Sequence, residues 1–185
     1  MGQRLIITVE KDSKEIATLY FHWSAYTLSS IEETAALIGF LDAHKKMDTR
    51  LACIRFVEEN GGCIDGGKGS SEFKAIQKMF PNETFKDDGN RNNGLVALTE
   101  NGMSKMRSWS EGDVTINLDD RTVLNWVNWT TRDSSEYDKS KISSTKYDIS
   151  DFSFDEIDDV YEVVDIASRL GLTLEHNGVY YKLIE

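Results

Sequence analysis

The sequence of 185 residues contains a single proline, only two cysteines and no long hydrophobic run. Cys53 and Cys63 do not indicate a disulfide framework, and no Cys or His stands at metal-ligand spacing from them, so we expect reduced thiols and no metal site. No segment reaches the roughly 18 apolar residues of a membrane span. The first residues lack the apolar stretch of a secretory signal, so we expect a soluble, intracellular protein that makes no membrane contact.

Basic side chains are also scarce, because 21 Lys and Arg stand against 32 Asp and Glu, for a net charge of −11. Proteins that bind nucleic-acid backbones gather Lys and Arg to release counterions, so direct binding to duplex DNA is not expected. An aromatic content of 10%, with four Trp, supplies core material that a chain disordered throughout would lack. The length predicts one compact domain.

The periodicity of apolar residues alternates between strand-like and helix-like segments, which predicts an α+β fold. We expect a single domain in which two or three β-hairpins pack against three or four helices. The expected elements are hairpins over 5–22, 114–130 and around the Asn177-Gly178 turn, a strand over 95–98, and helices over 30–46, from about 49 to Asn60, over 71–80, over 101–108 and from Ser153 to Gly171.

Composition divides the chain into three parts. Residues 1–130 form the expected α+β core, and residues 131–150, which are rich in Ser, Asp and Lys without a period, form the expected polar linker or loop. Residues 151–185 then supply an acidic amphipathic helix and a C-terminal hairpin that pack on the core. Most of the excess charge is local, since residues 131–165 carry 4 basic and 11 acidic side chains.

The acidic helix is the first candidate site. At 100° per residue its carboxylates share one face opposite Ile157, Val160 and Val164, at an axial spacing of about 5–6 Å that is comparable with the spacing of phosphates along a strand. No basic residue stands at i+3 or i+4 from these carboxylates in our interpretation, whereas most exposed helices mix charges of both signs at those positions. The competing interpretation is an ordinary solvated face. The candidate partner-binding residues are Asp151, Asp155, Asp158, Asp159, Glu162 and Asp165.

The same segment approaches the spacing of a calcium loop, but Glu156 stands where the sharp turn requires glycine, so we exclude that site.

A glycine-rich stretch is the second candidate, since glycines let backbone N–H groups approach an anion. The P-loop pattern fails because Gly69 stands where Ser or Thr would coordinate magnesium, and because the preceding segment is expected to be helical. A flexible loop between helices is therefore favoured over a nucleotide site. The ligand-binding candidates are Gly66, Gly67, Lys68, Gly69 and Ser70.

The third candidate lies where the chain leaves the first hairpin. His22 is a possible general base and Ser24 a possible nucleophile, and an i,i+2 pair in a strand points to one face. No orienting acid can be assigned to them, so an aromatic core cluster containing a hydrogen-bonded His is the favoured interpretation.

Five segments resemble, in order, an uncharacterised family of small proteins from phages and prophages of Gram-positive bacteria. They are MGQRL at 1–5, YFHWSAYT at 20–27, RFVEENGG at 55–62, GGKGS at 66–70 and WSEGD at 109–113. This resemblance covers about residues 1–120 and carries no catalytic signature. It implies expression in the cytoplasm of a bacterial host, and it makes an inhibitor of host defence, including an anti-CRISPR protein, a sensible class.

The leading hypothesis is a phage-encoded, non-enzymatic inhibitor without a cofactor. Its acidic residues would bind a basic nucleic-acid-handling host protein, with a CRISPR effector nuclease as the favoured partner, by mimicking nucleic-acid charge. One alternative is a module that sequesters a nucleotide or signalling molecule through the glycine-rich loop. A second is an enzyme acting on RNA or nucleotides in which His22, Ser24 and Lys68 take part.

Overall fold

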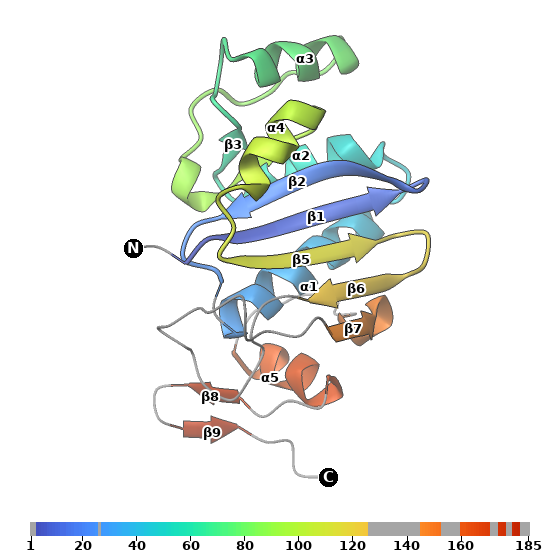
Figure 1. The fold of residues 1–185 in the computed structure, drawn as a ribbon, viewed down its shortest axis with the longest axis vertical. Coiled ribbons are helices and arrows are strands. Elements are labelled where there is room, and N and C mark those ends of the chain that lie inside the picture. The colour runs from blue at the N-terminus through green and yellow to red at the C-terminus, as the bar shows by residue number, and fades with distance from the viewer. Residues whose placement is uncertain are drawn as a thin grey trace.

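The computed structural model of the chain describes residues 3–25, 27–125, 145–152, 160–170, 174–176 and 179–181. These residues form an α+β domain around a seven-stranded mixed sheet of order β3-β4-β2-β1-β5-β6-β7 (Figure 1). The strands are β1 (Leu5–Lys11), β2 (Lys14–Phe21), β3 (Cys63–Ile64), β4 (Leu95–Ala97), β5 (Gly112–Asn117), β6 (Thr122–Asn125) and β7 (Thr145–Asp148).

Two pairs of neighbouring strands run parallel, and the other neighbours are antiparallel. β1 pairs with β2 as the predicted opening hairpin, but it also pairs in parallel with β5, so that Ile7 lies opposite Val114. β3 pairs in parallel with β4, and the chain between them carries a helix. The N-terminal strand is therefore central in the sheet and not at its edge.

Helices lie on both faces of the sheet. In Figure 1, α1 and α2 lie behind it, whereas α4 crosses the front of its upper half. The helices are α1 (Thr27–Ala43), α2 (Thr49–Glu59), α3 (Ser71–Met79), α4 (Glu100–Arg107) and α5 (Val160–Arg169), with 3₁₀ turns η1 (Arg91–Asn93) and η3 (Ile149–Phe152). None of the described helices has the length and apolar character needed to cross a membrane.

Side-chain caps fix where three of the helices begin. The carboxylate of Asp48 accepts a hydrogen bond from the backbone N–H of Arg50 at the start of α2, and Ser70 Oγ accepts from Phe73 N at the start of α3. Thr99 Oγ1 accepts from Gly102 N at the start of α4. Each cap satisfies a helical N–H that has no intrahelical partner, and a cap of this kind is worth about 1 kcal/mol.

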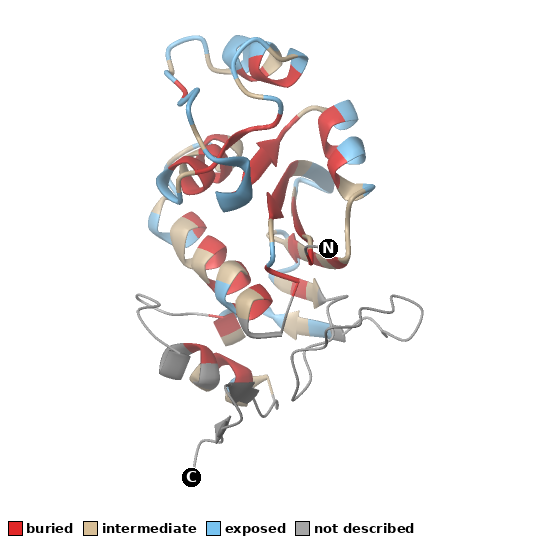
Figure 2. Cartoon of the chain, turned by 90° about the vertical axis from the view of Figure 1, so that its left-hand side faces the viewer, coloured by how far each residue is buried: buried red, intermediate tan, exposed pale blue. Residues whose placement is uncertain are grey.

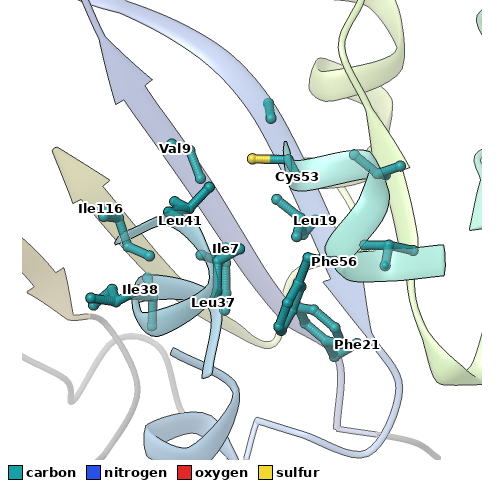
Figure 3. Close-up of a cluster of buried hydrophobic side chains, with 14 of the residues drawn as sticks. Ile7, Val9, Leu19, Phe21, Leu37, Ile38, Leu41, Cys53, Phe56 and Ile116 are labelled. Carbon is teal, nitrogen blue, oxygen red and sulfur yellow. The ribbon is translucent and has the colours of Figure 1, made fainter. Parts of the chain in front are cut away.

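The main core lies between the sheet and the helices α1 and α2 (Figure 3). Alternate residues of β1 and β2, such as Ile7 and Leu19, point toward Leu37 of α1 and Phe56 of α2. Buried residues lie mainly on the strands and on one side of each helix, and exposed residues gather in the turns and loops (Figure 2). A smaller cluster, which includes Tyr20 and Met106, lies under α4 on the other face of the sheet.

A buried carboxylate connects α3 to the segment that enters α4. Glu72 is 5% exposed and accepts hydrogen bonds from Leu98 N at 2.6 Å, from Thr99 N at 2.9 Å and from the Thr99 hydroxyl. These donors replace the water that the carboxylate loses on burial. The Glu72 contacts therefore fix the β3–α3–β4 unit against α4.

The structure confirms the predicted α+β class and differs from the prediction in two respects. It has more strands than two or three hairpins supply, and its five described helices, which match the five helical segments expected from the sequence, exceed the three or four expected to pack on the hairpins. The predicted linker over 131–150 also ends in ordered structure, because residues 145–148 form β7, which pairs with β6. Residues 149–150 of that linker begin η3, and residues 131–144 lie outside the described part of the chain. The predicted C-terminal hairpin is present as β8 (Leu174–His176) and β9 (Val179–Tyr181).

Candidate functional site

Helix α5 is docked on the domain by its apolar side. Val163, Ile166 and Ala167 are 2%, 0% and 0% exposed and belong to the main core, where the helix contacts α1. Asp165 lies outside this buried set, and its side chain is 44% exposed. Burial of three apolar residues fixes the rotation of the helix about its axis. The amphipathic character that the sequence predicts for this segment is therefore present in α5.

Asp151 belongs to a different element from the rest of the acidic set. It lies in η3, which the buried residues Ile149 and Phe152 hold in the core, and its side chain is partly exposed. The carboxylate of Asp148, just before η3, accepts hydrogen bonds from the hydroxyl and N–H of Ser150. These bonds stabilise the charged form and lower the pKa of Asp148. The prediction that one helix face carries Asp151 together with the later carboxylates is therefore wrong.

One of the predicted acidic residues has a cationic partner. The guanidinium Nη2 of Arg169 lies 3.2 Å from Oδ2 of Asp165, at i,i+4 spacing on α5. The expectation that no basic residue offsets this face at i+4 is thus wrong at its C-terminal end. Such an exposed helical pair contributes only about 0.3–0.5 kcal/mol, but it removes one negative charge from the surface. Asp155, Asp158 and Asp159 lie outside the described residues, and Glu162 is described only as part of the α5 backbone.

The glycine-rich loop follows a strand, which corrects the expectation of a preceding helix. Cys63 and Ile64 form β3 directly before it, and α3 begins directly after Ser70. Gly66, Gly67 and Gly69 have φ values of +76°, +64° and +89°, a region in which L side chains are strained. The conformation of the chain, and not a bound group, accounts for these glycines.

Three donors of this loop, Gly67 N, Ser70 N and Lys68 Nζ, have partners within the protein. Gly67 N donates to Ile64 O at 2.9 Å, and Ser70 N donates to Gly67 O at 3.1 Å. Lys68 Nζ lies 2.7 Å from the Asp87 carboxylate, and the pairing raises the pKa of Lys68 and lowers that of Asp87. An anion entering the loop would have to displace Asp87 from Lys68.

His22 and Ser24 do not form a catalytic pair. Tyr20 Oη lies 2.5 Å from His22 Nδ1, whereas Ser24 Oγ is within 3.5 Å of the backbone carbonyl of His22 and 3.4 Å of Glu33 Oε1. Trp23 between them has a φ of +65°, so the chain is not an extended strand at this point and the i,i+2 argument does not apply. His22 instead belongs to the aromatic cluster that the sequence favours, since its ring contacts those of Tyr20 and Trp23.

Sequence reasoning missed the acid that does lie beside Ser24. Burial of Glu33, and secondarily the negative charge of Glu32, raise the pKa of Glu33 to about 7. The Glu32-Glu33 pair has the composition of an ordinary first helical turn, so the sequence contains no signal that one of the two is largely buried. Lys68 shares no described contact with His22 or Ser24, so the three proposed participants of an enzyme are not brought together.

The cysteines behave as structural residues. Cys53 and Cys63 are both free and buried, and burial raises the pKa of Cys53 to about 12. A thiol in such surroundings stays protonated and is a poor nucleophile or metal ligand. In the described part of the chain, no three His, Cys, Asp or Glu side chains gather in a way that could hold a metal ion.

Comparisons of the chain with protein-family models, with curated proteins and with solved structures found no match.

Proposed function

We propose that this protein is an acidic, non-enzymatic inhibitor that binds a basic nucleic-acid-handling protein of a bacterial host. The acidic surface comprises Asp151, Asp155, Asp158, Asp159, Glu162 and Asp165. Its carboxylates would enter a groove lined by Lys and Arg and compete there with a nucleic-acid strand. A CRISPR effector nuclease is the partner class that the resemblance to phage and prophage proteins implies.

The observation that supports this proposal is the docking of α5 by its apolar side. Because Val163, Ile166 and Ala167 are buried in the core, the helix cannot turn its other side inward without exposing them. Asp165 on α5 and Asp151 on η3 are both partly exposed to solvent. A charge on an element that is already fixed loses less segmental entropy on binding, so the docked backbone of α5 supports a role for Glu162 and Asp165.

The geometry also limits what the acidic surface contributes. The Arg169 guanidinium offsets Asp165, so the segment before it must supply most of the charge. Asp155, Asp158 and Glu162 are therefore the residues to neutralise. Interactions of this kind accelerate association and weaken as salt screens them.

A binding experiment with a purified, guide-loaded CRISPR effector nuclease tests the proposal. We expect the dissociation constant to rise about tenfold or more between 50 mM and 300 mM NaCl. We expect a comparable rise in the dissociation constant for the triple variant D155N/D158N/E162Q. The matched control removes three exposed acids elsewhere, as E59Q/D88N/E100Q, and should bind within about twofold of the unmodified protein.

Three results would contradict the proposal: absence of binding at low salt, affinity independent of salt, or equal weakening by the two triple variants. The last result would mean that net charge and not the acidic surface determines binding. A competition arm with target DNA adds a functional readout, because a nucleic-acid mimic must lower DNA binding by the nuclease in proportion to its own occupancy.

A second candidate function is nucleotide binding by the glycine-rich loop. It is favoured by one observation, namely that β3, the loop and α3 follow one another as strand, glycine-rich turn and helix, with β4 parallel to β3. A ligand at 100 times its Kd would stabilise the protein by about 2.7 kcal/mol, which a thermal-shift panel of nucleotides would detect. K68Q should abolish the shift and K78Q should not. Absence of a shift for every nucleotide would exclude this function.

A further inference from the structure

A small pocket with a basic rim lies beside η3, the turn that also carries Asp151. It has a volume of about 180 Å³ and lies between the connection from α1 to α2 and the turn that joins β5 to β6. Its lining includes Lys11, Lys45, Arg121, Asp42, Leu41 and Ile149. This volume is below the roughly 300 Å³ of sites for drug-sized ligands, so it suits a fragment-sized molecule.

The charge of this pocket is opposite to that of the whole protein. Lys11, Lys45 and Arg121 line it, together with one acid, Asp42. Neither Lys45 nor Arg121 forms an ion pair with any residue that the structure describes, whereas Lys11 Nζ donates to Thr49 Oγ1 at 3.1 Å. In a chain of net charge −11, three cations around one cavity form a local positive field that attracts an anion.

The other acids near the pocket are already engaged. Asp48 pairs with Arg50 at 2.9 Å, and the carboxylate of Asp119 accepts hydrogen bonds from the backbone N–H groups of Asp12 and Ser13. Asp148, whose pKa Arg121 helps to lower, accepts hydrogen bonds from Ser150. Asp42 is then the acid lining the pocket that could compete with an incoming anion for the cations.

The basic rim is held in place by contacts between turns. The Asp119 carboxylate joins the β5–β6 turn to the β1–β2 turn through its bonds to Asp12 and Ser13 at 3.0 Å and 2.9 Å. Arg121 adopts a left-handed φ of +55°, and its carbonyl accepts a hydrogen bond from Ile149 N at 3.0 Å. These contacts fix the backbone of the turns that carry Lys11 and Arg121, so less segmental entropy is lost when a ligand binds.

The pocket also has an apolar floor that is continuous with the core. Leu41 and Ile149 are 8% and 3% exposed and belong to the main core, and Met47 and Leu118 pack against it. His44, also in the lining, is stacked on Phe40 with a ring-centroid distance of 4.0 Å, and its Nδ1 lies 2.9 Å from the Phe40 carbonyl oxygen. An apolar floor below a cationic rim matches a molecule that carries an anionic group on a small apolar body.

We infer that this pocket binds a small organic phosphate, with the phosphate at Lys11, Lys45 and Arg121 and the apolar part on Leu41 and Ile149. Three cations favour a doubly charged phosphate monoester over a singly charged carboxylate, because each cation gains more from the higher charge. The N-terminal turn of α2 supports the same choice, since Thr49 and Ala52 line the pocket where the positive end of the helix dipole lies. This site is independent of the proposed binding to a basic protein.

Titration of the full chain with phenyl phosphate, followed by calorimetry and by amide chemical shifts, tests the inference. We expect binding at least tenfold tighter than that of inorganic phosphate, which lacks the apolar part, and of benzoate, which lacks the second charge. K45Q/R121Q should weaken phenyl phosphate binding at least tenfold. The control K74Q/K78Q removes two exposed cations from α3 and should leave the affinity unchanged.

The single variant K45Q separates a loss of ligand binding from a loss of stability. Lys45 is exposed and has no described ion pair, so its replacement should leave the fold intact. It should retain the unfolding midpoint of the unmodified protein and bind phenyl phosphate several-fold more weakly. The inference is overturned if phenyl phosphate does not bind the unmodified protein, if inorganic phosphate or benzoate binds equally well, or if K74Q/K78Q weakens binding as much as K45Q/R121Q.

Discussion

At the scale of single residues, the most unusual group is the largely buried carboxyl of Glu33. Its pKa of about 7 means that it keeps its proton in the folded protein over a range in which the unfolded chain, with a pKa of 4.5, has released it. The contribution of Glu33 to stability is therefore complete below pH 4.5 and is lost as the pH rises through 7. The loss amounts to at most about 3 kcal/mol.

We predict that E33Q, which cannot ionise, becomes more stable relative to the unmodified protein as the pH rises from 4.5 to 7. Urea unfolding at several pH values measures the difference, which should level off above about pH 8. In E32Q the midpoint of this change should move to lower pH, because the charge of Glu32 raises the pKa of Glu33. A difference between E33Q and the unmodified protein that does not vary with pH would contradict the assignment.

Some residue-scale properties were readable from the sequence and others were not. Arg169 stands four residues after Asp165, so their ion pair follows from helical spacing alone. The left-handed φ of Trp23, a residue whose side chain is 51% exposed, leaves no trace in composition or periodicity. Because of this dihedral angle, the expectation that His22 and Ser24 lie on one face of a strand does not apply.

At the scale of elements, the loops around α3 show two separate uses of glycine. A Cβ at Gly62 would lie 2.4 Å from Gly94 O and 2.7 Å from Val57 Cγ1, so this glycine allows two backbone segments to approach. At Gly67 a Cβ would meet nothing within 4 Å, and only the φ of +64° favours glycine. The two positions thus separate steric crowding from backbone strain.

We predict that G62A lowers the free energy of unfolding by about 3 kcal/mol, because the crowded atoms belong largely to backbone that cannot move freely. G67A should cost only about 1 kcal/mol, the penalty of a left-handed alanine. Denaturant unfolding of both variants measures the contrast. Equal losses would show that the approach of residues 62 and 94 is looser than the structure indicates.

Predictions of whole elements were most reliable where the signal was local. The helical spacing of Phe73 and Ile76 predicted a helix over 71–80, and α3 covers Ser71–Met79. The parallel pairing of β1 with β5 joins segments that are about a hundred residues apart, and local patterns contain no information about which distant strand becomes a neighbour. The same reason explains why β7 was assigned to a linker, since Thr145–Asp148 is recognisable as a strand only beside β6.

At the scale of the whole molecule, the C-terminal part shares the main core with the N-terminal part. Phe152 is 0% exposed and contacts Tyr147, and Ile149, Val163 and Ile166 belong to the same cluster as β1 and α1. The elements η3 and α5, which carry Asp151 and Asp165, are thus attached to the domain through its core. The charge pattern alone suggests that the C-terminal part is an addition to a core that ends at residue 130.

We predict that F152A lowers the stability of the entire domain by about 3–5 kcal/mol and leaves a single cooperative transition. Far-UV circular dichroism and tryptophan fluorescence should report the same midpoint in urea. Two separate transitions, with the earlier one alone sensitive to F152A, would show that the C-terminal part unfolds on its own. The conservative variant F152L should lose much less stability, because it leaves a smaller cavity.

The central position of β1 has a consequence for biosynthesis. After the hairpin of β1 and β2 leaves the ribosome, the outer side of β1 stays without its neighbour until residues 112–117 of β5 have been translated. At about 5–20 residues per second this delay lasts roughly 5–20 s. During that time an apolar strand edge is available to other nascent chains. Crowded polysomes are therefore where this protein is most exposed to aggregation, and slow translation before residue 112 should reduce its yield.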